Sequence, residues 1–336
     1  MTSDENVLPK DLIILLCAVF GSHESKKGIR PLTALELHRL EQRLQCLDVT
    51  LTDLNDFDLE QFFLDWQDKS INFERVKALL NRSFSRGITL EQWAKAGIQV
   101  ITKTCKSYPA AFKEKLGHRI PPLIYCVGNP DFFDNQIKVA IVGSRNAPDK
   151  DLEAAELVSR SLANNNFAVV SGGARGVDDT AMLNCLKSGG NAIGILADNL
   201  FRKSRNKEYK LFLREGRLTL ISPFYPKAGF LAGHAMARNK LIYALSSHAI
   251  VMHSGLTGGT WQGSCENLKK GWAKTWVYRT ADNDAGNCHL VNQGAQWLPE
   301  NFSAVTQFPI EKNENDESMV KKLKNATQTS LFVSKK

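Results

Sequence analysis

The apolar positions of the first 86 residues recur every three or four residues, which is the spacing of one buried helix face. Three such segments follow one another. They cover residues 12–20, 35–47 and 76–80. Thr89 and Gln92 have the spacing of a capping box, so a further helix is expected to begin after Thr89. The pattern predicts a small helical domain over residues 1–86.

The pattern changes after Gln136, where short apolar, β-branched runs alternate with amphipathic stretches. The runs predict strands over residues 137–142, 167–170, 192–197, 218–222, 249–252 and 275–278. The stretches predict helices over residues 149–166, 178–188, 203–215, 229–245 and 261–270. Buried-type strands that alternate with helices are typical of a parallel, doubly wound sheet. The expected fold class is α/β, with the sheet inside a core domain over residues 87–305.

The chain ends in a polar, lysine-rich region over residues 306–336, with one short apolar stretch at 331–333. This composition predicts a polar tail that contains at most a short docked segment. Hydrophobic residues make up 43% of the 336 residues, so the rest of the chain can bury a sizeable core, and wholesale disorder is excluded.

Charge is distributed unevenly along the chain. There are 43 Lys and Arg against 35 Asp and Glu, which gives a net charge of +8. Residues 1–86 carry 11 basic and 14 acidic side chains, whereas the remainder carries 32 and 21. A basic balance fits an anionic partner, although it also serves solubility. An anion-binding region is therefore expected after residue 86.

The cysteines argue against a disulfide framework and against a metal site. Their number is odd, they are scattered, and no two have C-x-x-C spacing. They are Cys17, Cys46, Cys105, Cys126, Cys185, Cys265 and Cys288. The acidic N-terminus does not resemble a signal peptide, and the longest apolar run, 12–20, is shorter than a membrane helix. We expect a soluble cytoplasmic protein with buried thiols and no bound metal.

Candidate chemistry lies at the carboxyl ends of the predicted strands, where doubly wound sheets bind ligands. The first strand ends in Gly143, Ser144 and Arg145. Backbone N–H groups at the start of the next helix suit a phosphate, and the arginine could add a bidentate contact. The alternative is a tight turn with a surface arginine.

The second strand ends in a glycine-rich loop. Its residues are Ser171, Gly172, Gly173, Ala174, Arg175 and Gly176. Glycines permit positive φ and a close approach of the backbone to an anion, but the spacing is not that of a dinucleotide fingerprint. Asp178 is expected to cap the following helix. The alternative is turn chemistry alone.

A third turn contains Gly258, Gly259 and Thr260, whose amides and hydroxyl could bind a phosphate. Trp261, which follows, could stack on a base or pack in the core.

A strongly basic segment lies over residues 202–217. Seven cations face only Glu208 and Glu215 there. The cations are Arg202, Lys203, Arg205, Lys207, Lys210, Arg214 and Arg217. A surface that tracks phosphates is favoured, and a solvated amphipathic helix is the alternative.

Arg238, Asn239 and Lys240 lie in the next predicted helix and could close the pocket, or else form a surface patch. No catalytic motif marks these loops. His234, His248 and His253 lie near strand ends without a partner pattern, and we expect core or surface histidines.

Together these motifs resemble the DprA/Smf (DNA-processing protein A) family. They occur in order over roughly residues 90–300, from Ala96–Thr102, Tyr108-Pro109, Pro121-Pro122 and Gly128-Asn129 to Gly294-Ala295. Between them lie Gly143–Arg145, Ser171–Asp178, Ile221–Pro223, Ala237–Ile242, Ala244–Ser246 and Gly258–Trp261.

The resemblance implies a Rossmann-like core that binds single-stranded DNA without a cofactor and without catalysis. Family members protect incoming strands and help to load the recombinase RecA, often as dimers, in natural transformation or recombination. The family's pocket corresponds here to residues 143–145, 171–176 and 238–240. The resemblance also implies that Lys207 and its basic neighbours belong to this pocket.

The chain also departs from the family pattern. His253-Ser254 replaces an acidic residue, and Gly258–Trp261 is typical of a DprA-like subgroup. A C-terminal winged helix is not expected after residue 305.

The leading hypothesis is a non-catalytic protein that binds single-stranded DNA. The bases of the bound strand would stack on Phe224, Tyr225 or Trp261. The first alternative is a nucleotide-binding sensor or a LOG-like phosphoribohydrolase, in which Glu266 would be the catalytic acid. The second is a scaffolding subunit of a DNA-handling or defence complex.

Overall fold

A computed structural model describes residues 8–21, 29–55, 58–133 and 136–300. The predicted tail, including the apolar stretch at 331–333, lies outside the described residues. No helix among the described residues has both the length and the apolar composition that crossing a membrane requires.

The N-terminal part is helical, as predicted. Its helices are α1 (Pro9–Cys17), α3 (Ala34–Cys46), η1 (Leu51–Asn55), α4 (Leu59–Leu64), α5 (Phe73–Leu80) and α6 (Ser83–Lys95). Thr33 and Glu36 form a capping box at the start of α3, and the Asn72 side chain caps α5. The helix start predicted at Thr89 is wrong. Thr89 lies inside α6, where its hydroxyl donates to the Phe20 carbonyl.

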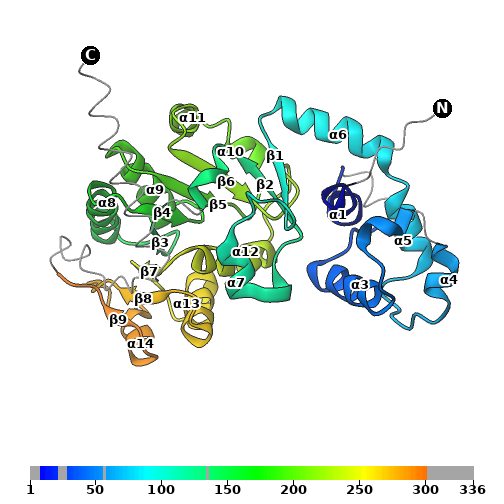
Figure 1. Cartoon of the computed structure of the whole chain (residues 1–336). Helices are drawn as coiled ribbons and strands as arrows, with labels where there is room; N and C mark the ends of the chain where they lie inside the picture. The colour runs from blue at the N-terminus through cyan, green and yellow to red at the C-terminus, as the bar shows by residue number, and fades with distance from the viewer. Residues whose placement is uncertain (1–7, 22–28, 56–57, 134–135, 301–336) are drawn as a thin grey trace, which may run out of the picture. The chain divides into compact units, whose positions relative to one another are not determined.

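The sheet has nine strands in the described residues, in the order β1-β2-β6-β5-β4-β3-β7-β8-β9 (Figure 1). They are β1 (Gln99–Thr102), β2 (Leu123–Val127), β3 (Lys138–Val142), β4 (Ala168–Ser171), β5 (Ala192–Ile195), β6 (Leu218–Ser222), β7 (His248–Val251), β8 (Lys274–Val277) and β9 (Gln296–Trp297). The pairs from β6 through β9 are parallel, whereas β2 pairs antiparallel with both β1 and β6. The predicted α/β class with a mostly parallel sheet is confirmed.

Helices cover both faces of the sheet. They are α7 (Ala110–Leu116), α8 (Asp149–Asn164), α9 (Val177–Lys187), α10 (Leu200–Lys203), α11 (Lys207–Arg214), α12 (Ala232–Leu245), α13 (Gly258–Lys270) and α14 (Asn287–Asn292), with short 3-10 turns η2 (Gly117–Arg119) and η3 (Pro130–Phe133). The single helix predicted over 203–215 is wrong. Asn206 accepts a hydrogen bond from Glu208 N and so starts a second helix, α11.

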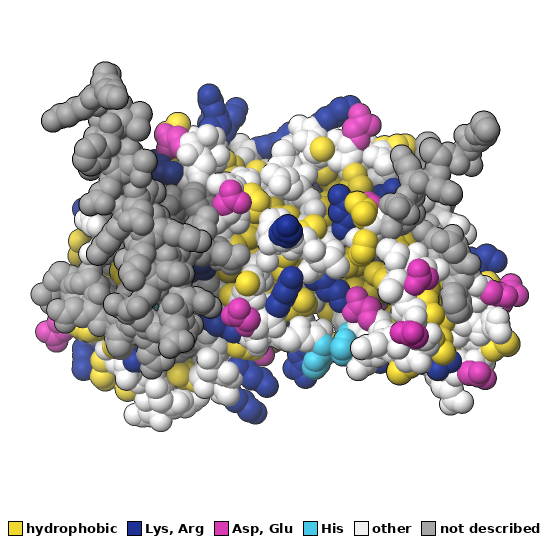
Figure 2. Space-filling view, viewed as in Figure 1, with side chains coloured by type: hydrophobic (Ala, Val, Ile, Leu, Met, Phe, Trp, Pro, Cys, Tyr) yellow, Lys and Arg dark blue, Asp and Glu magenta, His cyan; other side chains and the backbone are white. Residues whose placement is uncertain are grey.

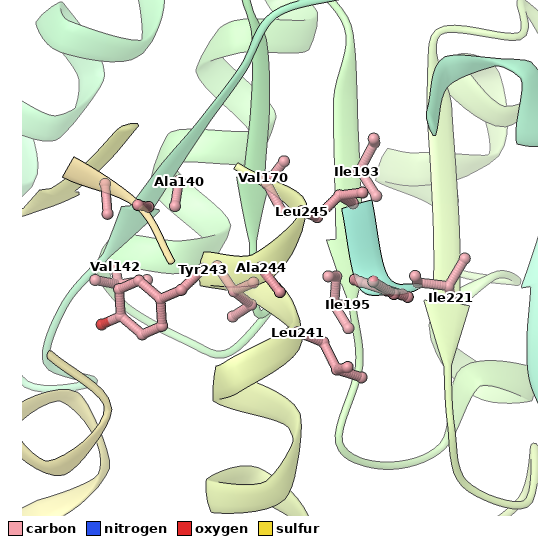
Figure 3. Close-up of a cluster of buried hydrophobic side chains, with 14 of the residues drawn as sticks. Ala140, Val142, Val170, Ile193, Ile195, Ile221, Leu241, Tyr243, Ala244 and Leu245 are labelled. Atoms are coloured by element: carbon pink, nitrogen blue, oxygen red, sulfur yellow. The ribbon is translucent and has the colours of Figure 1, made fainter. Parts of the chain in front are cut away.

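Strands β1, β2, β5 and β6 contribute to two apolar clusters, because alternate side chains point to opposite faces. Figure 3 shows Val170, Ile195 and Ile221 meeting Leu241 and Leu245 of α12. The next residues along the strands, such as Leu220, join a second cluster with Met182 of α9 and Trp93 of α6. All five residues of β2 and of β6 are buried, as expected for strands covered on both faces.

The second cluster also contains α1 residues, so the N-terminal helices share a core with the sheet. The described residues up to Leu298 pack as one compact unit, and the boundary placed at residue 86 falls within α6. The division into domains therefore stays a prediction. All seven cysteines are free thiols, and the expectation that they are buried is wrong for Cys46 and Cys288, which are exposed.

Candidate functional site

The turn after β3 presents an exposed arginine. Ser144 N donates to the His253 carbonyl (3.0 Å), which fixes this turn against the end of β7. The Ser144 hydroxyl accepts from Asn146 N (3.1 Å). The Arg145 guanidinium lies 4.5 Å from the centre of the Phe230 ring. Stacking of this kind orients an arginine without occupying its in-plane donors.

The loop after β4 approaches its neighbours closely. Gly176 has φ +88°, and a Cβ there would lie 2.6 Å from the Ser144 carbonyl oxygen, so both backbone conformation and space require glycine. Ser171 is buried and its hydroxyl donates to the Ile141 carbonyl (2.6 Å), which gives it a structural role. Asp178 does not cap α9, because no side chain caps this helix and its N-cap residue is Gly176.

Arg238 is a buried arginine beneath this loop, with 4% of its surface exposed. Its Nη1 donates to the carbonyls of Gly172 and Ile195, so it joins the carboxyl ends of β4 and β5. Burial lowers the pKa of Arg238, and the Asp178 carboxylate opposes that shift. Burial likewise raises the pKa of Asp178, against the effect of Arg238. Arg238 therefore holds the loop and the strand ends in place, and its donor Nη1 is used within the protein.

The neighbours of Arg238 on α12 differ from each other, because Asn239 lines the second cavity described below together with Arg238, whereas Lys240 does not. Asn239 donates from Nδ2 to the Gly259 carbonyl (2.9 Å), which ties α12 to the start of α13. Lys240 lines neither of the two cavities described below, and burial lowers its pKa while Glu266 opposes the shift.

The basic segment and the glycine loop line one cavity of about 920 Å³. It is lined by Arg145, residues 172–175, Arg238 and four cations of the basic segment. Those four cations are Arg202, Lys203, Arg205 and Lys207. Figure 2 shows Lys and Arg side chains at the top of the view, over α11. We call this cavity the basic cleft.

The other cations of the segment lie outside the basic cleft. Lys210 and Arg214 are exposed on α11 but do not line it. Arg217 turns inward, where it donates to the Leu186 carbonyl and pairs with Glu215.

A second cavity of about 490 Å³ adjoins the basic cleft and shares Arg145, Ala174, Phe230 and Arg238 with it. It is lined by the 143–145 turn, by residues 257–260 at the start of α13, and by apolar side chains such as Met236 and Ile242. The three predicted turns are thus brought together around two adjacent cavities.

The three aromatic residues that the sequence proposed for base stacking already contact other side chains of the protein. Phe224 stacks on His234, with ring centroids 3.9 Å apart, and Tyr225 lies against Trp93. Trp261 packs against the core. Sequence reasoning missed Phe230 and Phe201, which line the basic cleft. The sequence signal was the basic residues beside them, since Arg202 follows Phe201 and Lys227 lies three positions before Phe230. In the structure the centre of the Phe201 ring lies 4.0 Å from Arg205 Cζ and 4.9 Å from Lys227 Nζ.

The described residues do not place Glu266, the catalytic acid of the phosphoribohydrolase alternative, in either cavity. Glu266 is exposed on α13 and lines neither cavity. His248 and His253 are buried, and burial lowers the pKa of His248 to about 4. Among the described residues, no group of three or more His, Cys, Asp or Glu side chains is arranged to hold a metal ion.

Both cavities are lined by residues within the stretch 99–309, which matches the family model of DNA recombination-mediator protein A. The match covers more than half of the 336 residues. The chain belongs to this family. The resemblance to DprA/Smf proteins is thereby confirmed.

Relatives of known sequence agree with that membership. The chain is 28% identical to DNA processing protein DprA of Streptococcus pneumoniae over 193 residues, which are 56% of this chain and 67% of the relative. It is 30% identical to protein Smf of Synechocystis over 169 residues, which are 49% of this chain and 42% of that protein. The chain thus spans less than half the length of this second relative.

Two solved structures of the family are similar in fold. DNA processing protein A of Helicobacter pylori, described for its single-stranded DNA binding mode, aligns with a TM-score of 0.53 and 25% identity, over 62% of this chain and 94% of that chain. DprA of S. pneumoniae aligns with a TM-score of 0.62 and 21% identity, over 83% and 99%.

Proposed function

We propose that this chain is a DNA-processing protein that binds single-stranded DNA in the basic cleft and catalyses no reaction on it. The observation that carries the proposal is the set of exposed cations, Arg145, Arg202, Arg205 and Lys207, around the backbone loop 172–175. The single-stranded DNA binding described for the H. pylori family member supports the same ligand.

Phosphates would lie on the cations and on the loop amides, because both favour negative charge. Arg145 would bind through the donors that its stacking on Phe230 leaves available. Phe230, which is 49% exposed, offers a face to an unpaired base and takes the role predicted for Phe224, Tyr225 and Trp261. Duplex DNA keeps its bases stacked inside and cannot use this face.

We extend the proposal to the cellular role. DNA uptake, recombination or a related DNA-handling or defence process in the cytoplasm would supply the single strands. A RecA-type recombinase and a second copy of this chain are the proposed partners. Membership in the recombination-mediator family supports the process, and mixing the purified chain with RecA tests the partner.

The binding mode can be tested by titrating labelled oligonucleotides, duplex and mononucleotides into the protein at several salt concentrations. We expect single strands to bind best, with log K falling by about 0.7 per phosphate contact for each tenfold rise in salt. Phe230→Leu should weaken binding to a thymidine oligonucleotide but not to an abasic one of equal length. Equal binding of duplex, or no dependence on salt, would contradict the proposal.

A further inference from the structure

One carboxylate holds the ammonium group of a cleft lysine. Asp179, in the first turn of α9, has its Oδ1 and Oδ2 atoms 2.8 and 3.0 Å from Lys203 Nζ at the end of α10. The Tyr209 hydroxyl, on α11, donates to the same carboxylate. Lys203 Nζ also lies 5.0 Å from the centre of the Tyr209 ring. Asp179 therefore joins three helices at the wall of the basic cleft.

Lys203 remains next to the anion loop. A Cβ at Gly173 would lie 3.7 Å from Lys203 Cε, so the alkyl chain runs along the loop. The Lys203 and Asp179 side chains are 22% and 30% exposed, so the ion pair is open to water and to solutes. Within the described residues, the other basic-segment cations of the cleft, Arg202, Arg205 and Lys207, form no salt bridge.

We infer that Asp179 limits the affinity of the basic cleft by competing with a nucleic-acid phosphate for Lys203. The inference rests on the proposed function. A phosphate seated beside Gly173 must compete with this carboxylate, because Asp179 Oδ1 and Oδ2 accept from Lys203 Nζ and offset its positive charge. Asp179 thus tunes the affinity of the basic cleft and keeps the bound strand exchangeable.

The test is a double-mutant cycle on single-stranded oligonucleotide binding. Asp179→Asn keeps the shape of the side chain and an oxygen that accepts from Tyr209, but it removes the charge. We expect the affinity at 0.1 M salt to rise about threefold to tenfold, with a salt slope steeper by about 0.7, because one more phosphate is neutralised. In a Lys203→Met background the same substitution should give only the smaller gain that removing a negative charge near the cleft produces by itself.

Two controls separate this pairing from other effects. Asp198 also lines the basic cleft, so Asp198→Asn changes the general field, and its effect should be the same with and without Lys203. Tyr209→Phe breaks the bond to Asp179 without changing charge and should not raise the affinity. Thermal unfolding reports whether each variant is folded.

The outcomes are distinct. A folded Asp179→Asn variant with equal or weaker binding would overturn the inference, and so would a gain of undiminished size in the Lys203→Met background. Failure of the unmodified chain to bind single strands would instead contradict the proposed function.

Discussion

The N-terminal helices and the basic cleft use arginine in opposite ways. In the helices, the Glu36 side chain is 5% exposed and accepts from Arg75 (2.9 and 3.1 Å) and Arg30 (2.6 Å), so the charges satisfy each other. In the cleft, Arg145 is exposed and is oriented by an aromatic ring. An arginine that is paired with a carboxylate or carbonyl of the protein has a structural role. An arginine that lacks such a partner is available to a ligand.

Arg238 tests this distinction, because it lies in the cleft but has structural partners. Arg238→Met should lower the free energy of unfolding by about 3–5 kcal/mol, since two strand-end carbonyls and the Asp178 carboxylate lose their partner. Urea unfolding measures this change. A variant of unchanged stability that no longer binds DNA would place Arg238 with the ligand contacts instead.

Glu36 tests the paired side of the comparison. Burial alone would raise its pKa, but the Arg75 and Thr33 hydrogen bonds lower it to about 2 from the ordinary 4.5. The stabilisation is therefore complete above about pH 4.5 and is lost as the pH falls towards 2. Glu36→Gln should lower the free energy of unfolding by about 2 kcal/mol at pH 7. The difference from the unmodified chain should shrink between pH 4.5 and 3, and a constant difference would exclude the ion pair as its cause.

Arg145 tests the unpaired side. Arg145→Ala should weaken single-stranded DNA binding by about 1–2 kcal/mol while leaving the unfolding midpoint unchanged, because no protein carbonyl or carboxylate depends on it among the described residues. The matched control is Arg39→Ala, which removes an exposed arginine bound to Asp68 (2.6 Å) in the helical part. The comparison fails if both variants bind DNA equally well.

The positions of the parallel strands and of the three turns along the chain could be predicted from the sequence, because buried β-branched runs and glycine turns are local signals. The direction of side chains within α12 could not. Successive helix residues point about 100° apart, so Arg238, Asn239 and Lys240 cannot all face one cavity.

Contacts between residues far apart in the sequence could not be predicted either, because no local pattern marks them. Lys203 and Asp179 are 24 positions apart, and nothing local marks their pairing. Phe230 lies in a loop without periodicity, and it is the fold of the 143–145 turn that brings Arg145 over its ring. The antiparallel strands β1 and β2 are short and separated by α7, so no hairpin signal joins them.

The contact between Gly172 and Arg238 constrains how this chain can change by mutation. A Cβ at position 172 would occupy the space of the Arg238 guanidinium. Replacing the glycine first creates a clash, and replacing the arginine first leaves two carbonyls without a donor. Each single substitution produces a destabilised protein. We therefore expect these two positions, 66 residues apart, to change only in combination.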